Sequence, residues 1–152
     1  MKKIFCLALI CVAMFSLTSC ISATYIGKNG YYTAEAKDFD EHGWKEFVTI
    51  FVKDGVIISA EYNAKNTSGF IKSWDMEYMR VMSRSDGTYP NEYTRLYAAN
   101  LINTQNPDDI DIITGATHSH GTFVQLARAA IERANIGTQT VALVDFEPTE
   151  HE

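Results

Sequence analysis

The sequence predicts one α+β domain in which an antiparallel sheet with a hairpin packs against two or three helices. Alternating apolar residues flank a turn signal in the first half of the chain, and helical apolar spacing follows in the second half. The chain has 152 residues, of which 46% are hydrophobic and 21% are charged. That length favours one domain, and that composition supplies a core and argues against a disordered chain.

Three strands are expected in the first half. Around residues 31–36 apolar and polar residues alternate, which is a strand signal. Residues 46–52 are apolar or β-branched on both faces, as in a buried strand. Asp54 and Gly55 form a hairpin turn signal, and alternation resumes over residues 56–63.

Two helices are expected next. The first follows a loop at 66–69 and ends at residues 86–87, and its apolar positions are Ile71, Trp74, Tyr78 and Met82. The second begins at Pro90, which suits a first helical turn, and is broken at residues 106–107. Its expected apolar face consists of Tyr93, Leu96, Tyr97 and Leu101.

The strongest helical pattern comes last, after a short extended piece at residues 110–113. Its apolar positions have the spacing of an amphipathic helix and are Phe123, Leu126, Ala127, Ala130, Ile131 and Ala134. Gly137 is the expected C-cap, and residues 141–146 form the expected final strand. The folded domain is therefore placed at residues 30–147, with a tail at 148–152.

All three cysteines, Cys6, Cys11 and Cys20, lie within the first twenty residues. The rest of the chain therefore has no intramolecular disulfide framework and no cysteine-based metal cluster. Lys2 and Lys3 precede an uncharged, largely apolar run of about 14 residues, which is too short to favour a membrane-spanning helix.

The apolar run ends in Leu17-Thr18-Ser19-Cys20, which resembles the bacterial lipobox. The resemblance implies a signal peptide at residues 1–19 and a lipidated, palmitate-bearing Cys20 at the start of a tether over residues 20–29. The protein would then be extracytoplasmic and lipid-anchored to the cell membrane or to the outer membrane. In a Gram-negative host, Ile21 after the cysteine implies the outer membrane by resemblance to known sorting rules. An ordinary secretory signal or an uncleaved anchor is the alternative.

The net charge of −6 argues against a nucleic-acid module, which would show a basic face. Removal of residues 1–19 would take away Lys2 and Lys3 and no acidic residue, so the mature chain would be more acidic still. Attraction to anionic lipid is therefore not expected, and the anchor would consist of acyl chains.

The residues with chemical meaning lie at residues 111–119, where the extended piece passes through a small-residue turn into the last helix. Gly115 allows a ligand to approach the backbone, and Thr117 and Ser119 are possible N-caps. The first turn of a helix offers unpaired N–H groups and a positive dipole end, which suit a phosphate. On spacing alone, a plain strand–turn–helix with a threonine cap explains the segment equally well.

The segment Asp111-x-x-Thr114-Gly115-Ala116-Thr117 resembles the D-x-x-S/T-G-A-S/T motif of the FMN-binding domain family. That family includes flavin subunits of the Na⁺-pumping NADH:quinone reductase and of Rnf complexes, as well as small lipoproteins. The resemblance spans residues 30–136 and implies the family's α+β fold. It also implies that FMN is joined through its phosphate to Thr117 by a separate Mg-dependent flavin transferase, which uses FAD and releases AMP.

The resemblance implies roles for the neighbouring residues. Gly115 and Ala116 would leave room for the transferase and the phosphate. Thr114 and Ser119 would hydrogen-bond phosphate oxygens. Asp111 would be recognised by the transferase or would brace the turn.

His118 and His120 depart from the small hydroxyl residues that are usual after the motif, and they would donate to the phosphate or lie near the flavin. Their i, i+2 spacing is poor for a shared helical metal face, so no metal site is expected. A flavin ring also needs a cover, for which an aromatic or methionine side chain is suited. The candidates are Trp44, Phe70, Trp74, Tyr78 and Met79, although the residue types alone favour ordinary core packing for each of them.

The expected function is electron transfer with a membrane redox partner by a covalently bound FMN, with the protein supplying position and electrostatics. No general base is evident, so the chain is expected to be a carrier rather than an enzyme with its own substrate. The alternatives are a non-redox surface or binding lipoprotein with the same fold, and a protein that binds flavin non-covalently.

Overall fold

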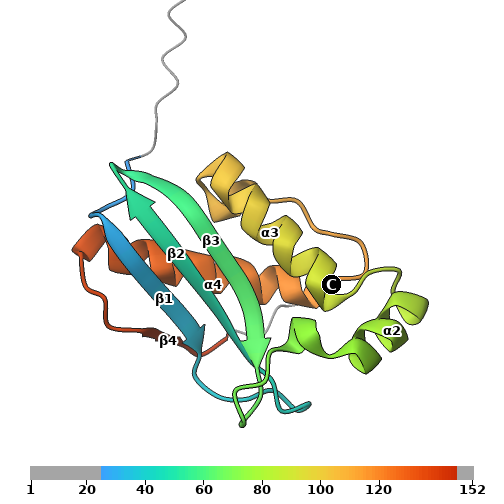
Figure 1. The fold of residues 1–152 in the computed structure, drawn as a ribbon. Coiled ribbons are helices and arrows are strands. Elements are labelled where there is room, and N and C mark those ends of the chain that lie inside the picture. Colours follow the sequence, from blue (N-terminus) through green and yellow to red (C-terminus); the bar gives the residue numbers. More distant parts are fainter. Residues whose placement is uncertain (1–24, 147–152) are drawn as a thin grey trace, which may run out of the picture.

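The computed structural model describes residues 25–146, in which a four-stranded sheet of order β3-β2-β1-β4 packs against helices (Figure 1). The elements in chain order are β1 (Gly30–Ala36), β2 (Lys45–Lys53), β3 (Val56–Lys65), the 3₁₀ turn η2 (Lys72–Trp74), α2 (Met76–Ser85), α3 (Pro90–Thr104), the 3₁₀ turn η3 (Pro107–Asp109), α4 (Thr117–Ile136) and β4 (Ala142–Val144). The predicted α+β class is confirmed. The sheet is mixed, because β4 runs parallel to β1.

The predicted hairpin joins β2 to β3 at Asp54 and Gly55, which have φ angles of 53° and 80°. Positive φ at both central residues is the signature of a type I′ turn, which matches the twist of the flanking strands. The final strand is shorter than predicted. It pairs with β1 only at its three residues Ala142–Val144, whereas residues 141–146 were expected to be extended.

A bulge in β3 changes which side chains face the core. The pairing with β2 skips Ile58, so Ile57 is buried before the bulge while Tyr62 and Ala64 are buried after it. The alternation predicted over residues 56–63 has no such bulge and therefore assigns Val56 and Ile58 to the same face as Tyr62. Because of the bulge, Val56 and Ile58 are exposed.

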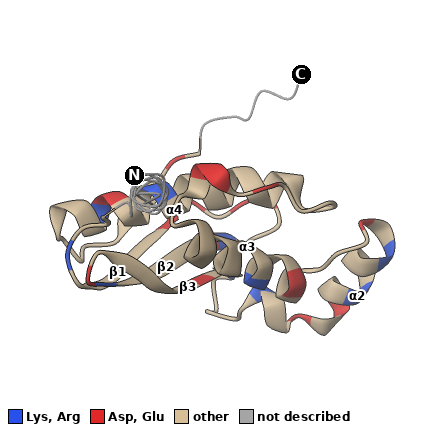
Figure 2. Ribbon diagram, turned by 90° about the horizontal axis from the view of Figure 1, so that it is seen from above, with Lys and Arg blue, Asp and Glu red and all other residues tan. Residues whose placement is uncertain are grey.

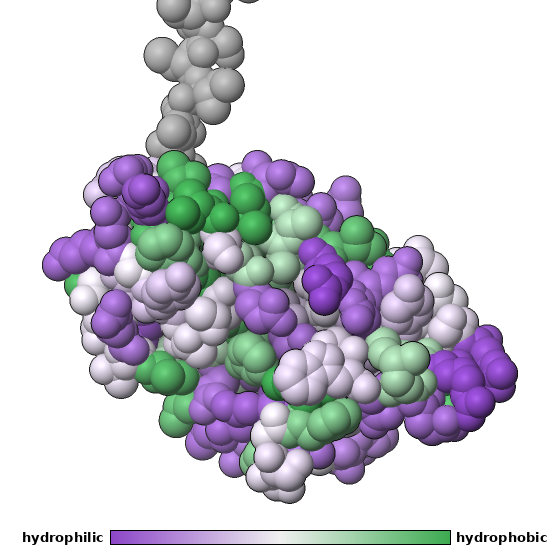
Figure 3. All heavy atoms as spheres, viewed as in Figure 1, coloured by the Kyte–Doolittle hydropathy of each residue, from purple (hydrophilic) through white to green (hydrophobic). Residues whose placement is uncertain are grey.

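The strand β2 is buried on one face rather than on both. Val48, Ile50 and Val52 are completely buried, and the residues between them are only partly buried. The prediction of burial on both faces is wrong because no second layer covers the other face among residues 25–146. On that open face Tyr31 stacks on Phe51 with 4.4 Å between ring centroids, and polar residues interrupt the apolar ones (Figure 3).

The helix predicted between the loop at 66–69 and residues 86–87 is interrupted at Asp75. The turn η2 ends there, and the Asp75 carboxylate starts α2 by accepting a hydrogen bond from the Tyr78 N–H at 2.9 Å. No residue of α2 is buried, and the helix projects from the body of the domain (Figure 1). On α3 the predicted apolar face is wrong at Leu96, which is exposed, while Tyr93, Tyr97 and Leu101 are buried.

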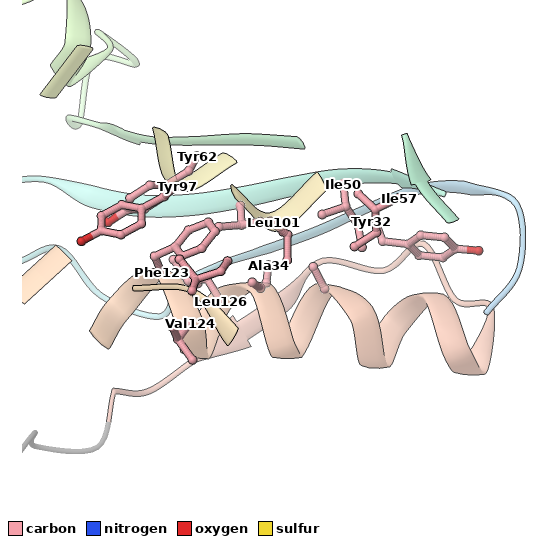
Figure 4. Close-up of a cluster of buried hydrophobic side chains, with 14 of the residues drawn as sticks. Tyr32, Ala34, Ile50, Ile57, Tyr62, Tyr97, Leu101, Phe123, Val124 and Leu126 are labelled. Atoms are coloured by element: carbon pink, nitrogen blue, oxygen red, sulfur yellow. The ribbon is translucent and has the colours of Figure 1, made fainter. Parts of the chain in front are cut away.

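The helix α4 forms the centre of the core, as its periodicity predicts. Phe123, Leu126, Ala127, Ala130 and Ala134 are completely buried. Figure 4 shows the Phe123 ring between α4 and the sheet, beside Tyr62 and Tyr97, with centroid distances of 5.0 and 5.2 Å. Gly137 ends the helix in the left-handed conformation at φ 77°, as expected for a C-cap.

The described end of the expected tether, residues 25–29, lies against the domain. Ile26 is buried and its N–H donates to the Gly55 carbonyl at 2.8 Å, and the Lys28 N–H donates to the Ala134 carbonyl at 3.0 Å. The predictions for the signal peptide, for Cys20 and for the tail at 148–152 lie outside the described residues. Within residues 25–146, no helix has the length and apolar character to cross a bilayer. Lys and Arg positions are interspersed with Asp and Glu positions along the described elements (Figure 2).

Candidate functional site

The motif residues 111–117 form a tight turn that leads into α4. Gly115 has a φ of 79°, a conformation that side chains rarely adopt. A Cβ atom at Gly115 would lie 2.2 Å from the carbonyl oxygen of Asp86, so the loop between α2 and α3 leaves no room for one. The Ala116 N–H closes the turn by donating to the Ile113 carbonyl at 2.9 Å.

The N-terminus of α4 is uncapped. The N-cap residue is Ala116, whose side chain cannot accept a hydrogen bond, so the prediction of a cap at Thr117 or Ser119 is wrong. Helical bonding begins with the His120 N–H, which donates to the Ala116 carbonyl at 3.0 Å. Within residues 25–146, no acceptor meets the N–H groups of Thr117, His118 and Ser119. These donors and the positive end of the helix dipole suit an anion.

The side chain of Thr117 is exposed at the first position of α4. Thr114 and Asp111 are exposed as well, and the side chain of neither makes a hydrogen bond or ion pair within the described residues. Of the two roles implied for Asp111, bracing of the turn is therefore not seen. An exposed carboxylate remains compatible with recognition by another protein.

The turn is braced instead by Tyr97, which the sequence placed only on the apolar face of α3. Its buried hydroxyl accepts a hydrogen bond from the Ile113 N–H at 3.0 Å and donates to the Ala116 carbonyl at 3.1 Å. Burial raises the pKa of Tyr97, so the hydroxyl stays protonated and able to donate. One side chain of α3 therefore holds both ends of the turn.

His120 and Ser119 lie behind the turn rather than at its exposed surface. The His120 Nε2 is 2.7 Å from the Ile110 carbonyl oxygen, and its ring centroid is 5.8 Å from that of Tyr97. Ser119 is buried, and its carbonyl accepts a hydrogen bond from the Tyr62 hydroxyl at 3.1 Å. His118, in contrast, is exposed.

Replacement of Tyr97 by phenylalanine tests the bracing contact. The ring keeps its packing, but the Ile113 N–H and the Ala116 carbonyl lose a partner, so the free energy of unfolding should fall by about 1–3 kcal/mol. Urea denaturation measures this loss, and amide exchange at Ile113 should become faster. Tyr31→Phe is the control, because its ring is exposed and its hydroxyl makes no hydrogen bond within the described residues. An unchanged stability and exchange rate in Tyr97→Phe would contradict the contact.

A cavity of about 260 Å³ opens beside the N-terminus of α4. It is lined by His118 and Thr122 of α4, Trp44 just before β2, Glu46 of β2, residues 36–40, and residues 144–146. The Glu46 Oε2 atom is buried and has no hydrogen-bond partner among the described residues. A larger cavity of about 540 Å³ lies between β3, η2 and α3 and contains none of the motif residues.

Two of the aromatic candidates for the flavin cover come together near this cavity. Trp44 and Tyr78 have ring centroids 6.4 Å apart, and the Lys72 ammonium lies 5.8 Å from the first ring and 4.9 Å from the second. These are cation–π distances. Of the five candidates only Trp44 lines the cavity with His118, since Phe70 and Trp74 form a separate exposed pair and Met79 lies on α2.

Sequence reasoning missed Tyr97, Glu46 and Lys72 as site residues. Glu46 had one local signal, because a charged residue opens an otherwise apolar strand. Lys72 and Tyr97 had none, since their positions follow from packing between distant elements.

Known proteins resemble this chain in sequence and in structure. A family model described as FMN-binding domain matches residues 43–132, which include the motif and Glu46. The "15 kDa lipoprotein" of Treponema pallidum (strain Nichols) is 38% identical over 109 residues, which are 72% of this chain and 77% of that protein. A crystal structure of a protein from Clostridium perfringens superposes with a TM-score of 0.76 at 39% identity, covering 79% of this chain and 98% of that one.

Proposed function

The chain belongs to the FMN-binding domain family, and from that premise we propose that it carries FMN as a phosphoester on Thr117 and transfers electrons at a membrane surface. The observation that carries the proposal is the exposed Thr117 hydroxyl on an uncapped helix N-terminus. The unpaired N–H groups at that position suit the ionised oxygens of a phosphodiester.

The remaining motif residues fit this attachment. Gly115 and Ala116 keep the approach to Thr117 free of bulky side chains, and Thr114 offers an exposed hydroxyl. The bond that forms joins the Thr117 oxygen to the FMN phosphorus of FAD. The bond from that phosphorus to AMP breaks, and the hydroxyl proton is released. Asp111 is exposed beside the site and serves in recognition by the transferase.

Bound FMN would supply the electron chemistry, because it accepts and donates electrons singly or in pairs. The protein's own residues hold and shield it. Tyr97 and His120 fix the turn that carries Thr117, and the buried ring cluster of Tyr62, Tyr97 and Phe123 makes that support rigid.

Membrane attachment through a lipidated Cys20 is the second part of the proposal. It is supported by the lipobox-like residues 17–20 and by the relative that is named a lipoprotein. Cys20→Ser should abolish the incorporation of radiolabelled palmitate that the wild type shows. Cys11→Ser, in the expected signal peptide, is the control and should keep the label. Unchanged labelling of Cys20→Ser would contradict lipidation at that residue.

Fluorescence in a denaturing gel tests the covalent flavin. The chain is produced with and without a co-expressed flavin transferase, and the gel is viewed under blue light before staining. We expect a fluorescent band only with the transferase. Flavin that appears in the native protein and is lost on denaturation would show non-covalent binding instead, and a colourless native protein from an active co-expression would favour a non-redox lipoprotein.

A further inference from the structure

The carboxyl group of Glu46 is buried without the partners that a structural ion pair would have. Glu46 occupies an inward position on β2, two residues before the completely buried Val48. Its Oε2 atom meets no hydrogen-bond partner within the described residues. Glu35 on the neighbouring strand shows the ordinary arrangement, since Lys65 and Lys45 lie 2.7 and 3.4 Å from its oxygens.

Groups from several elements face Glu46 without neutralising it. Burial raises the pKa of Glu46, and the nearby hydroxyls of Thr122 and Tyr62 and the charges of Lys72 and His118 offset only part of this increase. From α3, Tyr93 is close enough to interact with its charge. Lys72 makes no ion pair with Glu46, because its ammonium lies over the rings of Trp44 and Tyr78.

In the described part of the chain, the charged side chains on the rim of the cavity make no ion pair with Glu46. Lys37 pairs with Asp145 at 2.9 Å, and the Asp40 carboxylate accepts hydrogen bonds from the N–H groups of His42 and Trp44. Asp38 lines the cavity without a hydrogen bond or ion pair to Glu46 within the described residues. The Glu46 carboxyl therefore keeps its proton to a higher pH than a solvated glutamate does.

The cavity that contains Glu46 is the right size for part of a larger molecule. Its volume of about 260 Å³ lies just below the roughly 300–1,000 Å³ typical of pockets that enclose a whole ligand. His118, which lines it, directly follows Thr117, and Thr122 lines it one helical turn later. A group fixed at Thr117 therefore begins one residue away from the cavity.

We propose that Glu46 is a flavin-binding residue whose protonated carboxyl hydrogen-bonds from the buried Oε2 to the polar edge of the FMN ring held at Thr117. This inference rests on the proposed function. The pyrimidine edge of the ring carries carbonyl oxygens, which a protonated carboxyl can meet as a donor. An ionised carboxylate can only accept, and its negative charge beside the ring opposes the addition of electrons.

Glu46→Gln tests the protonation of this carboxyl in protein that carries no flavin. A group whose folded pKa is raised stabilises the fold below its unfolded pKa, near 4.5, and that contribution is lost as the pH rises through the folded pKa. Within that window the unfolding equilibrium constant of the wild type should rise by up to about tenfold per pH unit relative to that of Glu46→Gln. Glu132→Gln, at an exposed site in the second half of α4, should keep the wild-type dependence.

The flavin-loaded protein tests the contact with the ring. Loading of wild type and Glu46→Gln is first equalised by intact mass. The midpoint potential of the wild type should then fall more steeply with pH than that of Glu46→Gln across the titration of Glu46. The reduced-minus-oxidised infrared spectrum of the wild type should show a shift of a protonated carboxyl C=O band that is absent from Glu46→Gln.

The two proposals fail in distinguishable ways. A wild-type chain that an active transferase does not load overturns the proposed function and this inference with it. A loaded wild type whose infrared spectrum lacks the carboxyl band overturns the inference alone, even when Glu46→Gln does not fold. Parallel potential curves for the two loaded proteins overturn it as well.

Discussion

Replacing Thr117 by alanine should remove all covalent flavin from protein that is co-expressed with a flavin transferase. Alanine has no oxygen to form the phosphoester. The side chain of Thr117 is exposed at the first position of α4, so its loss should change the free energy of unfolding by no more than about 0.5 kcal/mol. In-gel fluorescence measures the loss of flavin, and urea denaturation verifies that the fold is intact.

Two matched variants define the specificity of that result. Thr117→Ser keeps a hydroxyl at the same position and should be loaded with flavin. Thr67→Ala removes an exposed hydroxyl from the loop after β3, far along the chain from the motif, and should be loaded like the wild type. Covalent flavin on Thr117→Ala would contradict the assignment of the acceptor.

Gly115→Ala should lower the free energy of unfolding by about 2–4 kcal/mol. The residue would have to hold a φ of 79°, and its Cβ would lie 2.2 Å from the Asp86 carbonyl oxygen. Because that oxygen belongs to the backbone, the loop before α3 must move away from the motif turn. The displaced turn should also slow flavin attachment, which a time course of in-gel fluorescence measures.

Gly87→Ala separates the two sources of destabilisation in Gly115→Ala, which are the left-handed backbone and the contact with the Asp86 carbonyl oxygen. Its φ of 75° is nearly the same, but a Cβ there would meet nothing within 4 Å. It should therefore lose only about 1–2 kcal/mol from the left-handed backbone and should accept flavin at the wild-type rate. Equal losses for the two variants would show that the loop does not press on Gly115.

The parts of the fold that could be predicted from sequence have local causes. Asp54 and Gly55 specify the turn between β2 and β3, Pro90 begins α3, and Gly137 ends α4. The apolar spacing of α4 predicts its buried face because a helix that crosses a sheet needs one continuous stripe.

The errors arise where tertiary packing overrides a local pattern. The extra residue Ile58 shifts the phase of β3, and the Asp75 cap divides one apolar repeat between η2 and α2. Leu96 has the right spacing for the face of α3 but is exposed, whereas Tyr93, Tyr97 and Leu101 on the same helix are buried. The spacing of the apolar residues gives no sign of these three departures from the predicted pattern.

The candidate site also combines features that the local sequence predicts with features that depend on tertiary packing. The motif is contiguous, so its position could be predicted, and its resemblance to a family motif supplied the chemistry of Thr117. The bracing by Tyr97 and the buried carboxyl of Glu46 come from other elements, which only the folded chain brings to the turn. Ala116 as the N-cap was also missed, because serine and threonine are favoured N-cap residues and alanine is not.

Intact mass spectrometry followed by peptide mapping tests the central claim most directly. Wild-type protein made with an active flavin transferase should be heavier by one FMN less one water, and the added mass should lie on the peptide that contains Thr117. Protein made without the transferase should lack this added mass. A wild-type chain without the added mass, from cells in which the same transferase loads another acceptor, would contradict the claim that Thr117 carries FMN.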